Sequence, residues 1–316
     1  MAVILKKIIA GREIPLPDLL KLWERSVRAS HFFLAEQDIL RLRPIVQEAL
    51  TGIPELLGIF VDASLIGFAG IQEDKLEMLF LAPEACGNGF GKEAVAVLVS
   101  QYGVKYVDVN EQNPAALHFY RRCGFIVYDR SETDPSGNPF PILHMTRKIL
   151  ETERLYLREM TPADSSSLAV MLQDIQVMYA WERTFSDDEV REWITRNRQR
   201  YQQYGYGYWL ACEKTADHVL GQIGLLPETI EGVEMLGIGW ILARNYWFCG
   251  YATEGAAECL HYAFQTLQAP EVIADIRPEN KASIRVAERI GMTPTGQYDK
   301  IVYGKIMPHL LYRIRQ

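Results

Sequence analysis

Apolar residues along the first half of the chain recur at two spacings, one typical of helices and one typical of strands. Between residues 92 and 102 they fall on one helical face, whereas shorter apolar runs bounded by turn residues are typical of strands. A cluster of Asp, Pro, Ser, Gly and Asn at 134–139 marks a turn. The pattern predicts helices over residues 19–30, 37–50 and 92–102, strands over 57–61, 65–71, 75–81 and 104–109, and two last strands flanking the turn.

The second half begins a similar succession around residues 149–152. Residues 155–159 alternate as an edge strand does, and the segments 161–164 and 186–189 carry capping patterns that open helices. The pattern then predicts strands over residues 206–212, 219–226, 234–242 and 272–276, with a turn at Gly250 and a long helix to about residue 267 before the last strand.

An asparagine and a glycine recur at one spacing in the two halves. Asn113, followed by Pro114, is typical of a helix N-cap, and Gly124 suits the left-handed residue after that helix. Asn280 precedes Gly291 at the same spacing. The same order of elements twice predicts a duplicated architecture, with domains over residues 1–148 and 149–316.

Length and charge narrow the class of protein. The 316 residues suffice for two α/β domains, and 48% apolar with 23% charged residues is ordinary for a globular chain. The net charge of -7 argues against nucleic acid as the main partner. An anionic cofactor stays possible, because local backbone dipoles rather than the overall charge would bind it.

The five cysteines are scattered without paired or metal-ligand spacing. We therefore expect reduced thiols, no metal site and a cytoplasmic protein. The first 15 residues lack the pattern of a secretion signal, and no uncharged apolar run approaches the roughly 20 residues of a membrane span. The sequence thus predicts no membrane partner, and it leaves the oligomeric state open.

A glycine-rich segment at residues 83–92 follows an apolar strand and opens a helix. Glycines there let backbone N–H groups converge on phosphate oxygens at the helix N-terminus, although a tight turn without a ligand would have the same composition. The segment lacks the ending of a P-loop, and it comes too late in the chain for a dinucleotide-binding fold.

The order of these elements resembles the GNAT superfamily of N-acetyltransferases, in two copies. The resemblance implies an α/β fold whose mixed, mostly antiparallel sheet carries helices on both faces and has central parallel strands that splay apart. It also implies acetyl-CoA as cofactor, with Cys86 in place of the usual basic or amide residue. The first loop would bind the diphosphate through Cys86, Gly87, Asn88, Gly89, Phe90, Gly91 and Lys92.

The segment 110–125 resembles the second coenzyme A motif of the family. By this resemblance Asn113 would contact the pantetheine arm as well as cap its helix. Tyr120 would return a proton to the departing thiolate, a role that a tyrosine hydroxyl can perform near neutral pH. The alternative for Tyr120 is a buried core aromatic residue.

Other roles follow from the same resemblance. Glu77 is the candidate base that takes the proton of the amine, and a solvated strand carboxylate is its alternative. His31 is a candidate acceptor-site residue, and a structural histidine is its alternative. A backbone N–H around Phe80 and Leu81 would polarise the thioester carbonyl.

The second half resembles the ribosomal-protein N-terminal acetyltransferase-like branch through the segments 150–158, 250–256 and 280–283. Its loop has Phe248 where a glycine is usual, and Gly237 stands where many relatives carry a glutamate. The resemblance gives its cofactor-binding residues as Leu242, Gly250, Tyr251, Ala252, Thr253, Asn280 and Ser283, with a helix first-turn role as the alternative for Ser283.

Together these features predict an acetyl-CoA-dependent N-acetyltransferase that uses direct attack by a primary amine. The first domain is the expected catalyst, and the acceptor is a small-molecule or peptide amine. The rival interpretation is a non-catalytic acyl-CoA-binding or scaffold protein with degenerate domains.

Overall fold

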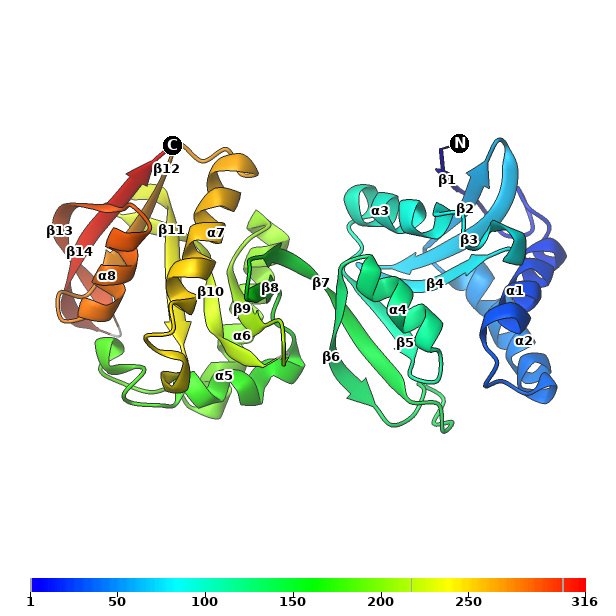
Figure 1. The fold of residues 1–316 in the computed structure, drawn as a ribbon, viewed down its shortest axis with the longest axis horizontal. Coiled ribbons are helices and arrows are strands. Elements are labelled where there is room, and N and C mark those ends of the chain that lie inside the picture. The colour runs from blue at the N-terminus through cyan, green and yellow to red at the C-terminus, as the bar shows by residue number, and fades with distance from the viewer. Residues whose placement is uncertain (1, 217, 303) are drawn as a thin grey trace. The chain divides into compact units, whose positions relative to one another are not determined.

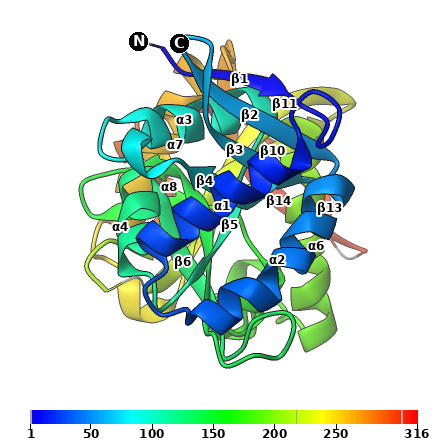
Figure 2. The same ribbon diagram turned by 90° about the vertical axis from the view of Figure 1, so that its right-hand side faces the viewer.

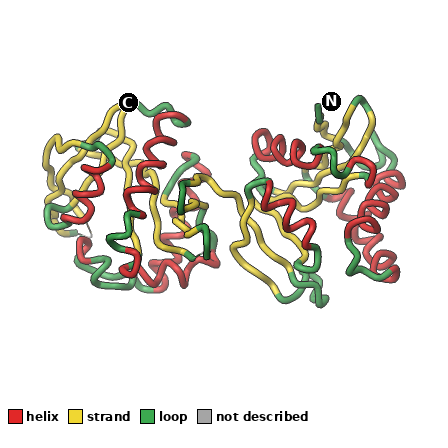
Figure 3. Tube along the Cα trace, viewed as in Figure 1, coloured by secondary structure: helices red, strands yellow, loops and turns green. Residues whose placement is uncertain are grey.

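The computed structural model describes residues 2–216, 218–302 and 304–316, and the chain divides into two compact units, Met1–Arg147 and Lys148–Gln316. Each unit is a mixed, mostly antiparallel sheet with helices packed on it (Figures 1 and 3). The α/β fold class expected for both halves is confirmed. Within the described residues, no helix is long and apolar enough to cross a membrane.

The first unit has the strand order β1-β2-β3-β4-β5-β7, with β6 paired to β7. Its elements are β1 (Ile4–Lys7), α1 (Leu16–Ser30), α2 (Glu36–Gly52), β2 (Glu55–Val61), β3 (Ser64–Gln72), β4 (Lys75–Leu81), α3 (Phe90–Tyr102), β5 (Tyr106–Asn110), α4 (Pro114–Arg122), β6 (Phe125–Ser131) and β7 (Ile142–Glu151).

Two apolar cores lie on the two faces of this first sheet. One contains Leu57, Leu76 and Val107 together with residues of α3 and α4. The other contains Leu56 and Phe68 together with residues of α1 and α2. Neighbouring strand residues such as Leu56 and Leu57 thus enter opposite cores, as the two-residue period of a strand requires. Figure 2 shows α1 and α2 in front of this sheet.

The parallel strands β4 and β5 separate after a short contact. Among the described residues they pair through Lys75 with Tyr106 and through Leu76 with Val107. Beyond that point β4 continues to Leu81, and within the described ranges it pairs there with β3 alone. This separation is the splay expected for a GNAT sheet, and it leaves backbone groups of β4 without a strand partner on one side.

The second unit repeats this plan with the strand order β8-β9-β10-β11-β12-β14-β13. Its elements are β8 (Leu155–Arg158), α5 (Ser165–Leu172), α6 (Asp187–Tyr204), β9 (Tyr208–Glu213), β10 (Val219–Ile230), β11 (Val233–Leu242), α7 (Tyr251–Gln265), β12 (Glu271–Ile276), α8 (Lys281–Arg289), β13 (Thr293–Val302) and β14 (Lys305–Arg315). The parallel pair β11 and β12 meets at Gly237 and Ile273.

Helices cover both faces of the second sheet as well. The Tyr208 ring lies 5.5 Å from the ring of Trp193 on α6, whereas the ring of the next residue, Trp209, lies 5.5 Å from that of Tyr262 on α7. These distances join ring centroids. Consecutive residues of β9 therefore pack under helices on opposite faces.

One strand assignment is wrong. The alternation at residues 155–159 predicts an edge strand, but β8 pairs with the end of β7 on one side and with β9 on the other. All four of its residues are buried. Even Arg158 is buried, because its guanidinium forms two hydrogen bonds to Asp164. In the sequence, a buried arginine of this kind cannot be distinguished from an arginine that faces solvent.

Candidate active site

The first glycine-rich loop has the backbone geometry of an anion site. Gly87 and Gly89 have φ angles of 81° and 85°, and Gly89 caps α3 without any side chain accepting from the first amides. A Cβ built on either glycine would meet open space. The first N–H groups of α3, which have no partner within the helix, are therefore not covered by a capping side chain and suit a diphosphate.

The other predicted residues of this loop surround the same turn. Asn88 stabilises it, since its amide donates to the carbonyl oxygen of Glu84 at 3.2 Å. The Cys86 thiol lies 3.6 Å from the carbonyl oxygen of Ala82, and burial raises its pKa. Phe90 and Gly91 begin α3, and Lys92 is exposed in its first turn. Among these side chains only Lys92 adds positive charge for the phosphates.

The second loop keeps this geometry although a phenylalanine replaces a glycine. Phe248 has a φ of 61°, and Gly250, which caps α7 without a capping side chain, has a φ of 84°. Phe248 is 88% exposed, so its side chain has few protein neighbours. Tyr251, Ala252 and Thr253 form the first turn of α7. The second loop therefore has left-handed residues at the same two positions as the first loop.

An arginine holds the second loop in place. The Arg154 guanidinium donates to the carbonyl oxygen of Cys249 at 3.0 Å and to the Glu254 carboxylate at 2.7 Å. Its plane lies over the Tyr251 ring, 4.4 Å from the centroid. Thr152 and the backbone N–H of Arg154 also donate to Glu254. The segment 150–158, which carried the resemblance of the second half, thus fixes the start of α7.

The two asparagines of the repeat have the same structural role. Asn113 accepts from the backbone N–H of Ala116 at 3.0 Å, and Asn280 accepts from the N–H of Ser283 at 3.0 Å. Both are N-caps, as predicted. The Ser283 hydroxyl lies 3.2 Å from the indole nitrogen of Trp240, which donates to it.

The two domains differ at the position predicted for the acid. Tyr120 lies on α4, seven residues after Asn113, and the corresponding residue on α8 is Ala287. The Tyr120 ring packs against Phe119 and Phe125, and burial raises the pKa of its hydroxyl. Within the described part of the chain, this hydroxyl has no hydrogen-bond partner. It therefore stays protonated at neutral pH and is free to donate.

The strand before each loop offers a backbone donor at its open side. Ala82 donates its N–H to the carbonyl oxygen of Ile66 on β3, and Ala243 donates to Leu220 on β10. Because N–H directions alternate along a strand, the N–H groups of Leu81 and Leu242 point away from those neighbours, to the side where the parallel strands separate. Phe80, the other predicted residue, has the orientation of Ala82 and faces β3.

The remaining predicted residues of the first domain lie on the face that α1 and α2 cover. Phe80 packs there, and the ring centroid of His31 lies 6.4 Å from that of Phe80. Burial lowers the pKa of His31, and Ser30 forms a 2.8 Å hydrogen bond to its Nδ1. Glu77 lies where β4 bulges, and its carboxylate is 3.2 Å from the Lys75 ammonium.

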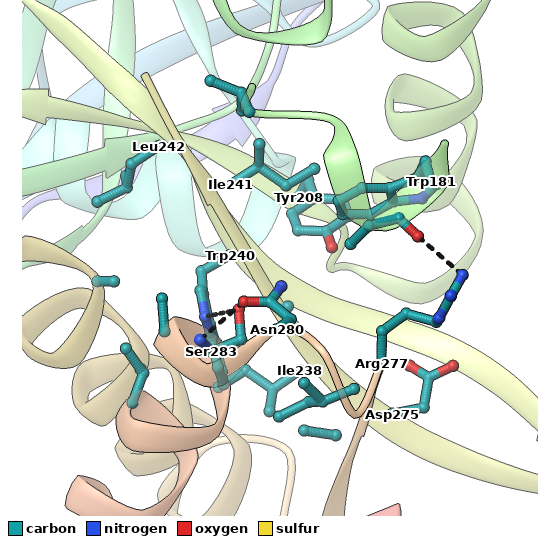
Figure 4. A pocket seen from close by; sticks show the side chains of 18 of the residues that line it. Trp181, Tyr208, Ile238, Trp240, Ile241, Leu242, Asp275, Arg277, Asn280 and Ser283 are labelled. Atoms are coloured by element: carbon teal, nitrogen blue, oxygen red, sulfur yellow. Dashed lines mark hydrogen bonds between the residues drawn. The ribbon is translucent and has the colours of Figure 1, made fainter. Parts of the chain in front are cut away.

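The second domain contains a cavity of about 730 Å³. Figure 4 shows Asn280 and Ser283 beside Trp240 on one part of its wall, and Trp181 and Tyr208 on another. Leu242 and the loop residues Gly250, Tyr251, Ala252 and Thr253 also line it. All seven residues predicted for cofactor binding in this half are thus brought to one cavity.

Sequence reasoning missed several residues of the two sites. In the cavity these are Trp181, Trp193, Arg196, Arg200, Asp275 and Lys300. In the first domain they are Asp108, Ser131 and His144, which form hydrogen bonds to one another. Trp193, Arg196 and Arg200 share one face of α6, but the other residues come from different elements, so no local spacing could have grouped the whole set.

Each half of the chain matches a family model. A model described as an acetyltransferase (GNAT) family matches residues 16–125, and one described as an acetyltransferase (GNAT) domain matches residues 154–293. YkkB, an uncharacterized protein of Bacillus subtilis, is 40% identical over 144 residues, which are 45% of this chain and 84% of that protein.

Two further relatives are named as acetyltransferases. The peptidyl-lysine N-acetyltransferase YjaB of Escherichia coli is 33% identical over 128 residues, which are 40% of this chain and 87% of YjaB. The crystal structure of a GNAT-family acetyltransferase from Bacillus anthracis has 25% identity and a TM-score of 0.46, covering 52% of this chain and 97% of that one. The two family models and the match to YjaB show that the chain belongs to the GNAT family and is an N-acetyltransferase built from two such domains in tandem.

Proposed function

We propose that the first domain catalyses transfer of an acetyl group from acetyl-CoA to a primary amine by direct attack, without a covalent enzyme intermediate. The observation that carries this proposal is Tyr120, a protonated hydroxyl on α4 at the position where the second domain has Ala287. Departure of a thiolate requires a proton, and α8 offers none at that position.

Different residues of the first domain would bind the cofactor, polarise the thioester and transfer protons. The backbone N–H groups at Gly87 to Lys92 would hold the diphosphate, and Asn113 would orient the pantetheine arm. Acetyl-CoA, when bound, supplies an activated thioester. The N–H of Leu81 donates to the carbonyl oxygen, and Tyr120 donates its hydroxyl proton to the sulfur. A base on the α1 and α2 face takes the amine proton, and Glu77 is one candidate, although Lys75 already pairs with its carboxylate.

The acceptor that we propose is a small-molecule or peptide amine, with the lysine side chain of a peptide as the first candidate. YjaB, named a peptidyl-lysine N-acetyltransferase, supports this choice. The face of the first domain that carries Glu77 also carries a row of rings formed by Phe80, His31, Phe33 and Phe140, whose successive centroids are 6.4, 5.6 and 6.0 Å apart. Such rings suit the aliphatic part of a lysine side chain.

For the second domain we propose coenzyme A binding in its cavity. Its loop has the geometry of the first loop, and Asn280, Ser283 and Leu242 line the cavity. Ala287 leaves it without the tyrosine of the first domain, whereas Glu228 and Asp275 supply carboxylates to its cavity.

A thiol-release assay with acetyl-CoA and a panel of amines that includes a lysine-containing peptide tests the proposal. Gly89→Val and Gly250→Val form a matched pair, since each closes one loop and leaves the other intact. We expect Gly89→Val to lower kcat/KM at least tenfold and Gly250→Val to leave it within about twofold, since only the first loop serves the catalysing domain. The opposite result would place catalysis in the second domain.

A further inference from the structure

A serine, a histidine and an aspartate form a hydrogen-bonded row across three strands of the first domain. The Ser131 hydroxyl on β6 lies 2.7 Å from Nε2 of His144 on β7. Nδ1 of the same ring lies 2.7 Å from the Asp108 carboxylate on β5. An ionised carboxylate can only accept, so Nδ1 carries the proton and Nε2 of the neutral ring accepts from Ser131.

This row lies at the point where β4 and β5 separate. Asp108 is the first residue of β5 after its last pairing with β4, and the Lys75 ammonium joins it, at 2.8 Å, to Glu77 on β4. The neighbouring residues Val107 and Met145 enter the core under α3 and α4. By strand alternation, Asp108 and His144 lie on the opposite face, which also carries His31 and Phe80.

Charged and titratable groups reach this row from every strand beside it. Lys75 and Glu77 come from β4, and the Tyr128 ring on β6 lies 6.2 Å from the ring of His144. Burial acts to lower the pKa of Lys75, but its contacts with Asp108 and Glu77 outweigh this and leave that pKa raised. Lys75 therefore stays charged and balances one of the two carboxylates.

We propose that Ser131, His144 and Asp108 form the proton relay that deprotonates the acceptor amine of the first domain. The relay rests on the proposed function of this domain and assigns its base. The ammonium N–H bond breaks and its proton goes to Ser131 Oγ, while the Ser131 proton goes to Nε2 of His144. The imidazolium is then paired with Asp108. The amine forms the C–N bond as the C–S bond breaks, and the sulfur takes the Tyr120 proton. The acetylated nitrogen loses its remaining excess proton to solvent and becomes the amide. Tyr120 then takes a proton from solvent and the imidazolium of His144 gives one up, so that one turnover releases one proton.

The second domain supports this assignment by contrast. Asp275 stands five residues before Asn280, as Asp108 stands five residues before Asn113. Asp275 accepts from the Tyr298 hydroxyl at 3.0 Å and from the Lys300 ammonium at 2.5 Å, and no histidine of the described residues contacts it. The histidine row and the tyrosine acid thus occur in the same domain. Glu77 is already engaged in an ion pair with Lys75, which a proton on its carboxylate would break.

The test compares variants of the full chain with acetyl-CoA and the amine that reacts fastest in the panel. His144→Gln removes the proton acceptor, Ser131→Ala shortens the row, and Asp108→Asn keeps its shape without charge. Glu77→Gln tests the rival base. Glu55→Gln, which removes another cross-strand ion pair of this domain, is the control for stability. Tyr120→Phe reports separately on the proposed function.

We expect His144→Gln to lower kcat about 100-fold or more, as loss of a general base does, and to change the dependence of kcat on pH. Coenzyme A affinity should stay within twofold. Added imidazole should restore part of the rate to His144→Ala, and Glu77→Gln should lower kcat less than His144→Gln does. A kcat within threefold of the unchanged protein, or an unaltered pH profile, would overturn the relay. If Tyr120→Phe still abolished turnover in that case, the proposed function would stand and only the relay would fail.

Discussion

Gly87 and Phe248 have the same left-handed backbone conformation at the same position of their loops, with φ angles of 81° and 61°. Glycine adopts this conformation without cost, whereas an L side chain is strained in it. The loop of the second domain therefore has this geometry although the backbone of a phenylalanine disfavours it. The interactions of Arg154 with the Cys249 carbonyl oxygen and with Glu254 supply part of the restraint.

Replacing Phe248 with glycine and Gly87 with phenylalanine should change the free energy of unfolding in opposite directions. Phe248→Gly relieves a strain of about 1–2 kcal/mol, less the roughly 0.5–1 kcal/mol by which glycine favours the unfolded chain. Because the phenylalanine is almost fully exposed, little packing is lost. We expect the free energy of unfolding of the second domain, measured with urea, to rise by up to about 1 kcal/mol.

Gly87→Phe is the matched variant in the first domain. It introduces the strain that Phe248 carries, without an arginine to hold the loop, so it should destabilise that domain by about 1–2 kcal/mol. A stabilising effect of Gly87→Phe, or a destabilising effect of Phe248→Gly, would contradict the strain that the φ angles imply.

Glu254 should make the second domain sensitive to acid. Burial acts to raise its pKa, but hydrogen bonds from Thr152 and from Arg154 outweigh burial and leave the pKa below its usual 4.5. The folded state therefore binds the proton less well than the unfolded state. The stabilisation is complete above about pH 4.5 and is lost as the pH falls through the lower pKa of the folded state.

Glu254→Gln should lower the free energy of unfolding by about 1–3 kcal/mol at pH 7, the range for hydrogen bonds to a charged group. It should also flatten the loss of stability between pH 5 and 3. Glu153→Gln, at an exposed neighbour, should change it by less than about 0.5 kcal/mol. Equal acid sensitivity of the Glu254→Gln variant and the unchanged protein would count against this account.

The two N-cap asparagines separate a structural from a catalytic contribution. Asn113→Ala and Asn280→Ala each remove one cap and should each cost about 1 kcal/mol of domain stability. Only Asn113→Ala should also lower kcat/KM, because only its domain is proposed to turn over. An equal loss of activity in both variants would mean that the two domains share the catalysis.

The features that could be predicted from the sequence are those that depend on residues close together in the chain. The caps at Asn113 and Asn280 and the left-handed glycines are set by a few neighbouring residues, so residue types at fixed spacing predict them. Strand β8 was mistaken for an edge because Arg158 is buried through Asp164, a partner that periodicity alone does not reveal. The strands β1, β13 and β14 were also missed.

The proton relay could not be predicted, for a related reason. Asp108, Ser131 and His144 are far apart in the sequence, and only strand pairing brings them together. The same holds for the cavity of the second domain, whose wall combines α6, β9, β11 and β12. Phe248 was misleading for a different reason. Its residue type disfavours the left-handed conformation of the loop, but it adopts that conformation in the structure.

The most direct measurement of the central claim is the steady-state rate of the Tyr120→Phe variant, determined together with its affinity for coenzyme A. If Tyr120 is the acid that protonates the thiolate, kcat should fall about 100-fold or more, while the dissociation constant for coenzyme A stays within about twofold. Double-reciprocal plots of the unchanged protein should intersect, as direct attack requires. A Tyr120→Phe variant with unchanged kcat would contradict the account.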